Sequence, residues 1–366
     1  MVMLPTMVTL PADLNSQETS AMSMFKQAFS RPARFGVLRL RCARCVAPVW
    51  LACAALMQTP LQAQDFPNRA LRVIVPQPPG GGFDTTARML ADKLGPLLGQ
   101  SVVVENRPGA GTLVGTEAAA KAPADGYTML LGGLSNIALN PGLYQKLPYD
   151  SLRDFAVVAL PVSYSYTLVG RKDLPHNSLK DILDFARANP DQLTYASGGN
   201  GSGQHIAPAV IAHLTGVKMV HVPYKGAQAA YQDLIAGRVD LFFDATPTAR
   251  GQIDGGTVKP IAVSSKARQA VHPNLPTVAE SGVAALDGFD MQTWFGLFVP
   301  AATPPAVLAR LRAEMAKVMA MADLIERFQK SGGTPLRMTP AETEALVKRD
   351  VERWSRVIRE AGIKGD

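Results

Sequence analysis

The sequence repeats one order of elements: a strand, a glycine-rich loop, a helix, a strand, a turn, a second helix and a third strand. In the first copy, the β-branched run 71–75 precedes a loop ending in Gly80-Gly81-Gly82, and apolar residues at helical spacing predict a helix over 84–98. A strand over 102–104, a helix over 112–121 and a strand over 127–131 follow. The second copy is predicted as strand 193–196, loop 197–203, helix 204–214, strand 218–222, helix 227–236 and strand 239–243. Two such βαβαβ units predict two α/β domains with mainly parallel sheets.

The C-terminal part departs from this order. It is predicted as a strand over 291–299, a helix from Pro304 and Pro305 to about residue 319, and a helix that begins at the capping box Thr339-Pro340-Ala341-Glu342. The last helix carries a stripe of apolar residues, namely Leu346, Val351, Trp354 and Ile358. We expect this stripe to pack the helix back onto one of the domains.

Composition limits the class of protein. The 366 residues are 18% charged and 47% hydrophobic, which is typical of a soluble globular chain long enough for two domains. The formal charge of +7 is concentrated at the start, because residues 1–63 hold six Lys or Arg and only two Asp or Glu. The remaining chain, with a net charge of +3, has no dense basic block with interleaved aromatic residues. Nucleic acid is therefore not an expected partner.

Residues 1–63 have the pattern of a secretory signal peptide. Arginines between positions 31 and 44 precede an uncharged stretch over 46–64, which is apolar over 46–57, and Leu61-Gln62-Ala63 offers a small residue for cleavage. The apolar run is shorter than the roughly 20 residues that span a bilayer. A lipoprotein anchored through Cys53 and a later start at Met22 or Met24 remain alternatives. We expect a periplasmic protein whose mature chain begins near Gln64.

The three cysteines lie in this leader, at positions 42, 45 and 53. Cys42 and Cys45 have the spacing of a redox or zinc pair, but no second pair or nearby histidine completes a metal site. The sequence therefore predicts neither a metal nor another cofactor.

Both glycine loops follow a strand and precede a helix, which is where ligands bind in open α/β sheets. Glycine lets the backbone approach a ligand closely, and a helix N-terminus adds roughly half a positive charge. Two such loops facing one another would suit an anion such as a carboxylate. Neither loop matches a P-loop or a dinucleotide fingerprint. The simplest role of Asp84 and Ser202 is to cap their helices.

The sequence offers no evident catalytic set. His205, His213 and His221 lack a metal-binding spacing, and Ser197 lacks the preceding glycine of a nucleophile elbow. A pairing of Ser197 with His205 and Asp244 leaves a periplasmic serine hydrolase as an alternative. Lys225 either attracts an anion or is simply solvated.

Eight motifs in order resemble the Bug-type periplasmic solute receptors of tripartite tricarboxylate transporters. They are VPQPPGGGFD (75–84), VENRPGAG (104–111), ADGYT (124–128), LPYD (147–150), YASGGNG (195–201), HVPYKG (221–226), PTVAE (276–280) and AGIK (361–364). The likeness extends from about Phe66 to the C-terminus.

The resemblance implies a type II periplasmic-binding-protein fold, in which two α/β lobes surround a ligand cleft. Lobe 1 would comprise residues 64–164 and 288–366, and lobe 2 residues 165–287. Such receptors are not enzymes; they bind small organic acids, di- or tricarboxylates or aromatic carboxylates, and deliver them to membrane permease subunits, usually as monomers. A ligand sensor that partners a signalling kinase is an alternative with the same binding. The ligand contacts carried over by the resemblance are Gly81, Gly82, Phe83, Asp84, Ser135 and Asn136 in lobe 1, and Ser197, Gly198, Asn200, Gly201, His205, Tyr224, Lys225 and Asp244 in lobe 2.

Three departures from the family pattern bear on the ligand. Phe83 stands where many relatives have a small or hydroxyl residue, and the stretch 132–138 lacks the hydroxyl-rich run often found there. Asp244-Ala245-Thr246 replaces a commoner Asp-Asn. These changes predict a less polar cleft, so an aromatic or partly apolar acid fits as well as citrate or malate.

Overall fold

Two sets of three parallel strands form the framework of the computed structural model, which describes residues 66–365. In the first set β1 (Leu71–Val75) lies between β2 (Val102–Asn106) and β3 (Thr128–Gly133). In the second set β5 (Thr194–Ser197) lies between β6 (Val220–Pro223) and β7 (Leu241–Ala245). The two βαβαβ units predicted from the sequence are confirmed.

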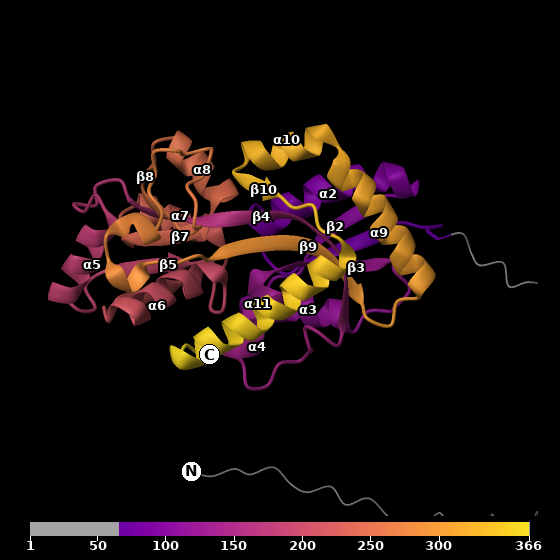
Figure 1. The fold of residues 1–366 in the computed structure, drawn as a ribbon, viewed down its shortest axis with the longest axis horizontal. Coiled ribbons are helices and arrows are strands. Elements are labelled where there is room, and N and C mark those ends of the chain that lie inside the picture. Colours follow the sequence, from indigo (N-terminus) through magenta and orange to yellow (C-terminus); the bar gives the residue numbers. More distant parts are fainter. Residues whose placement is uncertain (1–65, 366) are drawn as a thin grey trace, which may run out of the picture. The chain divides into compact units, whose positions relative to one another are not determined.

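A long strand, β4 (Phe155–Arg171), connects the two sets. It runs antiparallel to β9 (Gln292–Pro300) as far as Ser165, and from Tyr166 onward it pairs with β7 and with β8 (Val258–Val263). The path of strands is β2-β1-β3-β9-β4-β7-β5-β6, and the short β10 (Gly333–Pro335) also pairs with β4. Figure 1 shows β4 and β9 running between a group that contains α5, α6 and α7 and a group that contains α2, α3 and α9.

The expectation of mainly parallel sheets is therefore wrong. β4 and β9 run between the two groups of strands, and every pairing that they make is antiparallel. Strand β4 was not predicted from the sequence. Its residues are buried along almost the whole strand, so it lacks the alternation of polar and apolar residues that marks a strand with one solvent face.

Helices cover the strands on both sides of the sheet. They are α2 (Gly82–Leu98), α3 (Leu113–Ala120), α4 (Asn140–Leu143), α5 (Leu179–Ala188), α6 (Gly203–Thr215), α7 (Ala227–Ile235), α8 (Thr246–Asp254), α9 (Pro305–Ala320), α10 (Ala322–Lys330) and α11 (Pro340–Glu360). Short turns of 3₁₀-helix occur at Ala110–Thr112, Ala279–Ser281 and Ala284–Leu286, and a π-helix spans Leu134–Leu139. Across residues 66–365, no helix has both the length and the apolar character needed to span a bilayer.

The helix limits follow from local chemistry. α2 begins at Gly82, two residues before the predicted start, and ends at Gly99, whose left-handed backbone (φ 68°) suits glycine. α6 begins after Ser202, whose hydroxyl accepts the backbone N–H of His205, and ends at Gly216 in the same left-handed conformation. Both helices were predicted, and both are confirmed.

The C-terminal helix packs as expected. Thr339 and Glu342 form the predicted capping box of α11. Val351, Trp354 and Ile358 are buried in the core that also contains α4 and the π-helix, whereas Leu346 is only partly buried. The predicted signal peptide and its three cysteines lie outside the described residues.

Candidate ligand-binding site

Both glycine loops open onto one small cavity, called here the first cavity. Gly81 and Gly82 lead from β1 into α2, and Ser202 and Gly203 lead from β5 into α6. Its walls consist of Gln77, Gly81, Gly82, Phe83, Ser135, Tyr166, Ser202, Gly203, Gln204, Ala227, Asp244, Ala245, Thr293 and Phe295. Only about 20 Å³ of it can hold the centre of a water molecule, so the walls lie nearly in contact. Two helix N-termini, whose first N–H groups have no partner inside the helix, thus meet at one small space.

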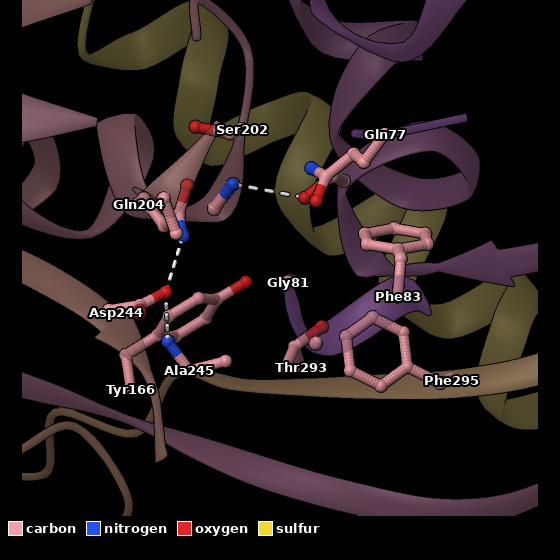
Figure 2. Close-up of a pocket in the computed structure, with 14 residues that line it drawn as sticks. Gln77, Gly81, Phe83, Tyr166, Ser202, Gln204, Asp244, Ala245, Thr293 and Phe295 are labelled. Carbon is pink, nitrogen blue, oxygen red and sulfur yellow. Dashed lines mark hydrogen bonds between the residues drawn. The ribbon is translucent and has the colours of Figure 1, made fainter. Parts of the chain in front are cut away.

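One side of the first cavity is polar. Figure 2 shows Gln204 and Asp244 on this side, linked by a hydrogen bond. The Gln204 amide donates to Oδ1 of Asp244, and its oxygen accepts the backbone N–H of Gly198 at 2.8 Å. The same Asp244 oxygen also accepts the N–H of Ala245 at 2.8 Å. Gln204 therefore ties the second glycine loop to the carboxyl group.

The Asp244 carboxyl is buried, with 1% of its surface exposed. Burial raises its pKa to about 7, although the hydrogen bonds from Gln204 and Ala245 lower it in part. A neutral carboxyl can face an anionic ligand without repulsion, whereas its ionised form opposes that ligand. The ionisation of Asp244 therefore bears directly on binding.

Tyr166 points its hydroxyl toward the middle of the first cavity (Figure 2). Burial raises its pKa to about 12, so the phenol keeps its proton at neutral pH and remains a donor. Thr293 on β9 lies on the same wall, and its hydroxyl and that of Ser135 lower the pKa of Tyr166 in part. These hydroxyl groups are the side-chain donors that the cavity offers to a carboxylate.

The opposite side of the first cavity is aromatic. Phe83 and Phe295 meet edge to face, with ring centroids 4.6 Å apart (Figure 2). Phe83 comes from the first turn of α2, and Phe295 comes from β9. This pair supplies the apolar surface that was predicted because Phe83 stands where many relatives have a small or hydroxyl residue.

Ser135 and Asn136 lie in the π-helix that follows β3. The Ser135 hydroxyl lines the first cavity and accepts the N–H of Gly203 at 3.0 Å, which joins the β3 side of the site to the second glycine loop. Asn136 is fully buried and does not reach the cavity. Its side-chain oxygen accepts the N–H of Gly133, and its amide donates to Thr116. Asn136 therefore holds the π-helix that presents Ser135.

Asp84 supports the first glycine loop rather than lining the cavity. Its Oδ2 accepts the N–H of Gly80 at 3.0 Å, and Arg88, one turn along α2, pairs with the carboxylate at 2.9 Å. Burial opposes ionisation, but the hydrogen bonds from Arg88 and Gly80 prevail and hold the pKa of Asp84 below its usual value. The helix-capping role expected for Asp84 is wrong, because the N-cap of α2 is Gly81 and Asp84 lies within the first turn, from which its carboxylate reaches back to the loop.

Ser197 and His205 also stand behind the second glycine loop. The Ser197 hydroxyl lies 2.6 Å from Nε2 of His221 and accepts the N–H of Gly199. His205 stacks on His221, with ring centroids 4.0 Å apart, and its Nδ1 accepts the N–H of Gly201. The stacked rings of His205 and His221 thus hold the backbone of the loop in place.

The hydrolase arrangement of Ser197, His205 and Asp244 is not assembled. Ser197 contacts His221, and Asp244 contacts Gln204 and Ala245. Burial, with a smaller effect from His205, lowers the pKa of His221 to about 3, which makes it a weak base.

Three other predicted residues, Gly198, Tyr224 and Lys225, line a second cavity that adjoins the first. Asn200 and Gly201 line neither cavity. The carbonyl of Asn200 packs against Gly111, where an added Cβ would lie 2.3 Å from its oxygen, and Gly201 packs near Leu143. Of the fourteen residues predicted to bind the ligand, the first cavity therefore contains Gly81, Gly82, Phe83, Ser135 and Asp244.

Several residues of the first cavity were not predicted from the sequence. Gln77 and Gln204 each adjoin a glycine loop, and from this position both could have been predicted as lining residues. Tyr166, Thr293 and Phe295 lie within β4 and β9. Both strands are buried on both faces, so no sequence pattern distinguishes a side chain that faces the cavity from one that faces the core.

Comparison with known proteins decides the family. A family model described as "Tripartite tricarboxylate transporter family receptor" matches residues 86–363. The chain belongs to this receptor family. The resemblance to Bug-type receptors is thereby confirmed.

Relatives of this family member match along nearly their whole length. A protein encoded in the tcbD–tcbE intergenic region of Pseudomonas sp. (strain P51) is 37% identical over 317 residues, which are 87% of this chain and 94% of the relative. Among solved structures, Rpa4515 of R. palustris with adipate is 32% identical, with a TM-score of 0.78 over 82% of this chain and 99% of that one. The periplasmic binding protein BugD is 34% identical, with a TM-score of 0.77 over 82% of this chain and 99% of its own. The two-lobe α/β fold of periplasmic binding proteins is thus confirmed.

Proposed function

We propose that this family member is an extracytoplasmic receptor that binds a small organic carboxylate in the first cavity and delivers it to a membrane permease of the tripartite tricarboxylate type. It acts by binding, without catalysis. The lobes comprise 64–164 with 288–366, and 165–287. The change of pairing partner along β4, between Ser165 and Tyr166, supports this division.

The observation that carries the proposal is the meeting of two helix N-termini at a cavity with hydroxyl donors. The first residues of α2 and α6, Gly82 and Gly203, both line this space, so the partial positive charge of two helix N-termini acts on it, and Tyr166 adds a phenol that stays protonated. Cationic side chains are absent from the described residues that line the first cavity. A carboxylate can be held by such backbone and hydroxyl donors alone. The adipate in the structure of Rpa4515 supports this class of ligand.

The proposal is tested by thermal unfolding of the purified, ligand-free protein with a panel of aliphatic and aromatic carboxylates. An acid at a hundred times its Kd adds about 2.7 kcal/mol to the free energy of unfolding, which raises Tm by several degrees. We expect a selective rise with one class of acid. A panel that leaves Tm unchanged contradicts the proposal.

A matched pair of glycine variants tests whether the ligand binds in the first cavity. An added Cβ at Gly203 would lie 1.8 Å from the Tyr166 hydroxyl, so Gly203→Ala closes the cavity and should abolish the rise in Tm. Gly251 in α8 has open space around it, so Gly251→Ala should leave binding intact. Equal responses of the two variants would show that the ligand binds elsewhere.

A further inference from the structure

A groove lies where α4 meets the segment that follows α11, and it is called here the C-terminal groove. Its walls are residues 141–146 on one side, and Arg359 with residues 362–365 on the other. The N–H of Gly365 donates to the carbonyl of Leu143 at 3.2 Å and so joins the two walls. Figure 1 shows the end of α11 beside α4. The groove has a volume of about 760 Å³ and shares no described residue with the first or the second cavity, so it is a separate feature.

The C-terminal groove is positively charged. Lys146, Arg359 and Lys364 line it and are exposed, and no carboxylate is among the described residues of its walls. None of the three cationic side chains forms an ion pair or a hydrogen bond within residues 66–365. Three cationic groups without a partner in that part of the chain thus surround one hollow.

The end of α11 does not need these cations. The carbonyls of Val357, Ile358 and Arg359 accept the backbone N–H groups of residues 361–363 at 3.0 or 3.1 Å. Gly362 allows this closure through its left-handed backbone (φ 65°). The helix C-terminus contributes roughly half a negative charge, which three cations exceed. The groove therefore keeps an excess of positive charge that the fold itself does not use.

The walls of the C-terminal groove also include apolar side chains. Leu143 belongs to the core, and Tyr144 and Ile363 are partly buried against it. A flat bilayer surface is met by basic residues that protrude, whereas a hollow that combines cations with apolar walls suits an acidic chain segment. The groove therefore favours a segment of protein over a membrane.

Tyr144 connects the C-terminal groove to the second glycine loop. An added Cβ at Gly201 would lie 3.3 Å from the Tyr144 hydroxyl and 3.2 Å from Leu143, so both side chains lie against that loop. An added Cβ at Gly365 would lie 2.6 Å from the Tyr144 ring, so the same ring also packs on the C-terminal segment. Tyr144 and Leu143 belong to lobe 1, and Gly201 belongs to lobe 2. Separation of the lobes therefore removes a contact that supports one wall of the groove.

We infer that the C-terminal groove receives an acidic segment of a partner protein and holds it more tightly when the lobes are closed. Lys146, Arg359 and Lys364 pair with carboxylates of the segment, and the apolar walls contact the rest of it. This inference rests on the proposed function in one respect, because a receptor that delivers its ligand has to be recognised in its closed, loaded form. The position of Tyr144 then lets the partner distinguish a loaded receptor from an empty one.

The first test measures the binding of an acidic probe. The Kd of fluorescently labelled hexaglutamate is measured by anisotropy at low ionic strength, with labelled hexaglutamine as the uncharged probe. One variant combines Lys146→Gln, Arg359→Gln and Lys364→Gln. The matched control removes the same charge by changing three exposed cations elsewhere to Gln, namely Lys172, Lys218 and Lys266. We expect the groove variant to bind hexaglutamate roughly tenfold more weakly, as suits three exposed ion pairs, and the control to bind like the unaltered protein.

The second test measures the coupling between the groove and the first cavity. The Kd of hexaglutamate is measured again on protein saturated with the carboxylate that raises Tm most in the panel. We expect about fivefold tighter binding, and hexaglutamate should raise the affinity for that carboxylate by the same factor, because coupling between two sites is reciprocal. An added Cβ at Gly111 would lie 2.3 Å from the carbonyl oxygen of Asn200, so Gly111→Ala keeps the lobes apart. This variant should lose the gain without altering any residue of the groove.

The outcomes separate the two proposals. If hexaglutamate does not bind, or if the groove variant and the control bind it equally, the groove is refuted while the carboxylate receptor stands. Co-sedimentation with phosphatidylglycerol vesicles that only the groove variant loses, without hexaglutamate binding, would assign the groove to a membrane instead. An unchanged or weaker affinity in the presence of the carboxylate would refute the coupling. If no carboxylate raises Tm, the proposed function fails and the coupling with it, whereas the groove is still judged by hexaglutamate and the two triple variants.

Discussion

At the scale of single residues, the ionisation of Asp244 controls the charge of the first cavity. Its folded pKa of about 7 lies above the ordinary value of 3.8. The stability that its protonated form contributes is therefore present below about pH 4 and is lost as the pH rises through 7. The ionised carboxylate also opposes an anionic ligand over the upper part of the same range.

We therefore expect the affinity for a bound carboxylate to fall roughly tenfold between pH 6 and pH 8.5, which corresponds to a change of one unit in the pKa of Asp244 when the anion binds. Asp244→Asn keeps an oxygen that accepts from Gln204 and Ala245, and it should bind with little dependence on pH. Calorimetric Kd values across this range measure the effect. Asp191→Asn, at an exposed site far from either cavity, should behave like the unaltered protein. A fall that persists in Asp244→Asn would assign the titration to another group.

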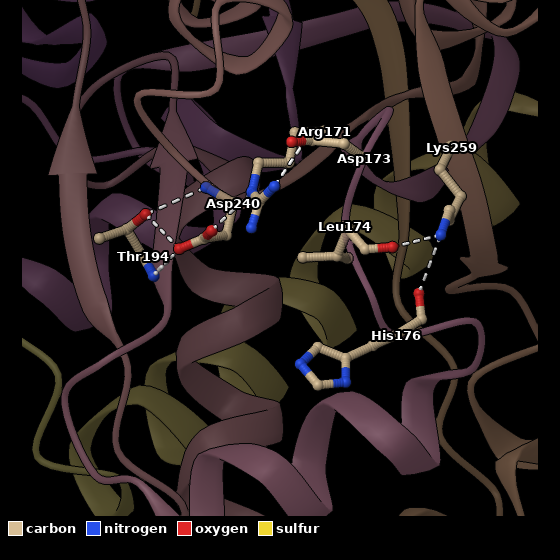
Figure 3. Close-up of polar contacts among 7 residues, drawn as sticks. All are labelled: Arg171, Asp173, Leu174, His176, Thr194, Asp240 and Lys259. Carbon is tan, nitrogen blue, oxygen red and sulfur yellow. Dashed lines mark hydrogen bonds and ion pairs between the residues drawn. The ribbon is translucent and has the colours of Figure 1, made fainter.

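At the scale of secondary-structure elements, a polar cluster holds together the N-terminal ends of β5 and β7. Figure 3 shows Asp240 between Thr194 and Arg171. The carboxylate accepts both the N–H and the hydroxyl of Thr194 at 2.9 Å and pairs with Arg171 at 3.0 Å. Lys259 binds the carbonyls of Leu174 and His176 in the same view. The cluster joins the end of β4 to the beginnings of β5 and β7.

Asp240→Ala should lower the free energy of unfolding by about 2–3 kcal/mol, because it leaves the partly buried groups of Thr194 and Arg171 without their acceptor. Asp173 pairs with the same Arg171 from solvent, with 79% of its side chain exposed, so Asp173→Ala should cost less than about 1 kcal/mol. Denaturant unfolding of both variants measures the difference. Equal losses of unfolding free energy in the two variants would mean that the cluster does not stabilise these strand ends. Ligand affinity should be unchanged in each variant.

The same scale shows what could be predicted from the sequence. The βαβαβ units were predictable because a glycine stop or a capping residue marks the limits of α2 and α6. β4 was not, since 17 nearly continuous buried residues carry no period. The role of His221 was missed for a related reason. Its partner Ser197 lies on the next strand, and only strand pairing brings the two together.

At the scale of the whole molecule, the first glycine loop lies against α7 and the turn that precedes it, and the second loop contacts Ser135 through Gly203, which is a closed arrangement. Gln228 in α7 donates to the carbonyl of Gly80, and Pro78 packs beside Gly226. The first cavity is too small to admit a carboxylate ligand in this state. Entry therefore requires the loops to separate, as in hinge closure around a ligand.

We expect small-angle X-ray scattering to give a larger radius of gyration for the ligand-free protein than for the protein saturated with a bound acid. Gly203→Ala supplies the control, because its cavity cannot accept the ligand and its scattering should not respond to the acid. Identical scattering of the unaltered protein with and without ligand would contradict an opening of the lobes.

The continuity of β4 has a consequence for how the chain is assembled. One uninterrupted backbone segment supplies the partner of β9 on one side of Ser165 and the partners of β7 and β8 on the other. Because the backbone of β4 belongs to both sets of strands, we expect the two sets to unfold together in one cooperative transition.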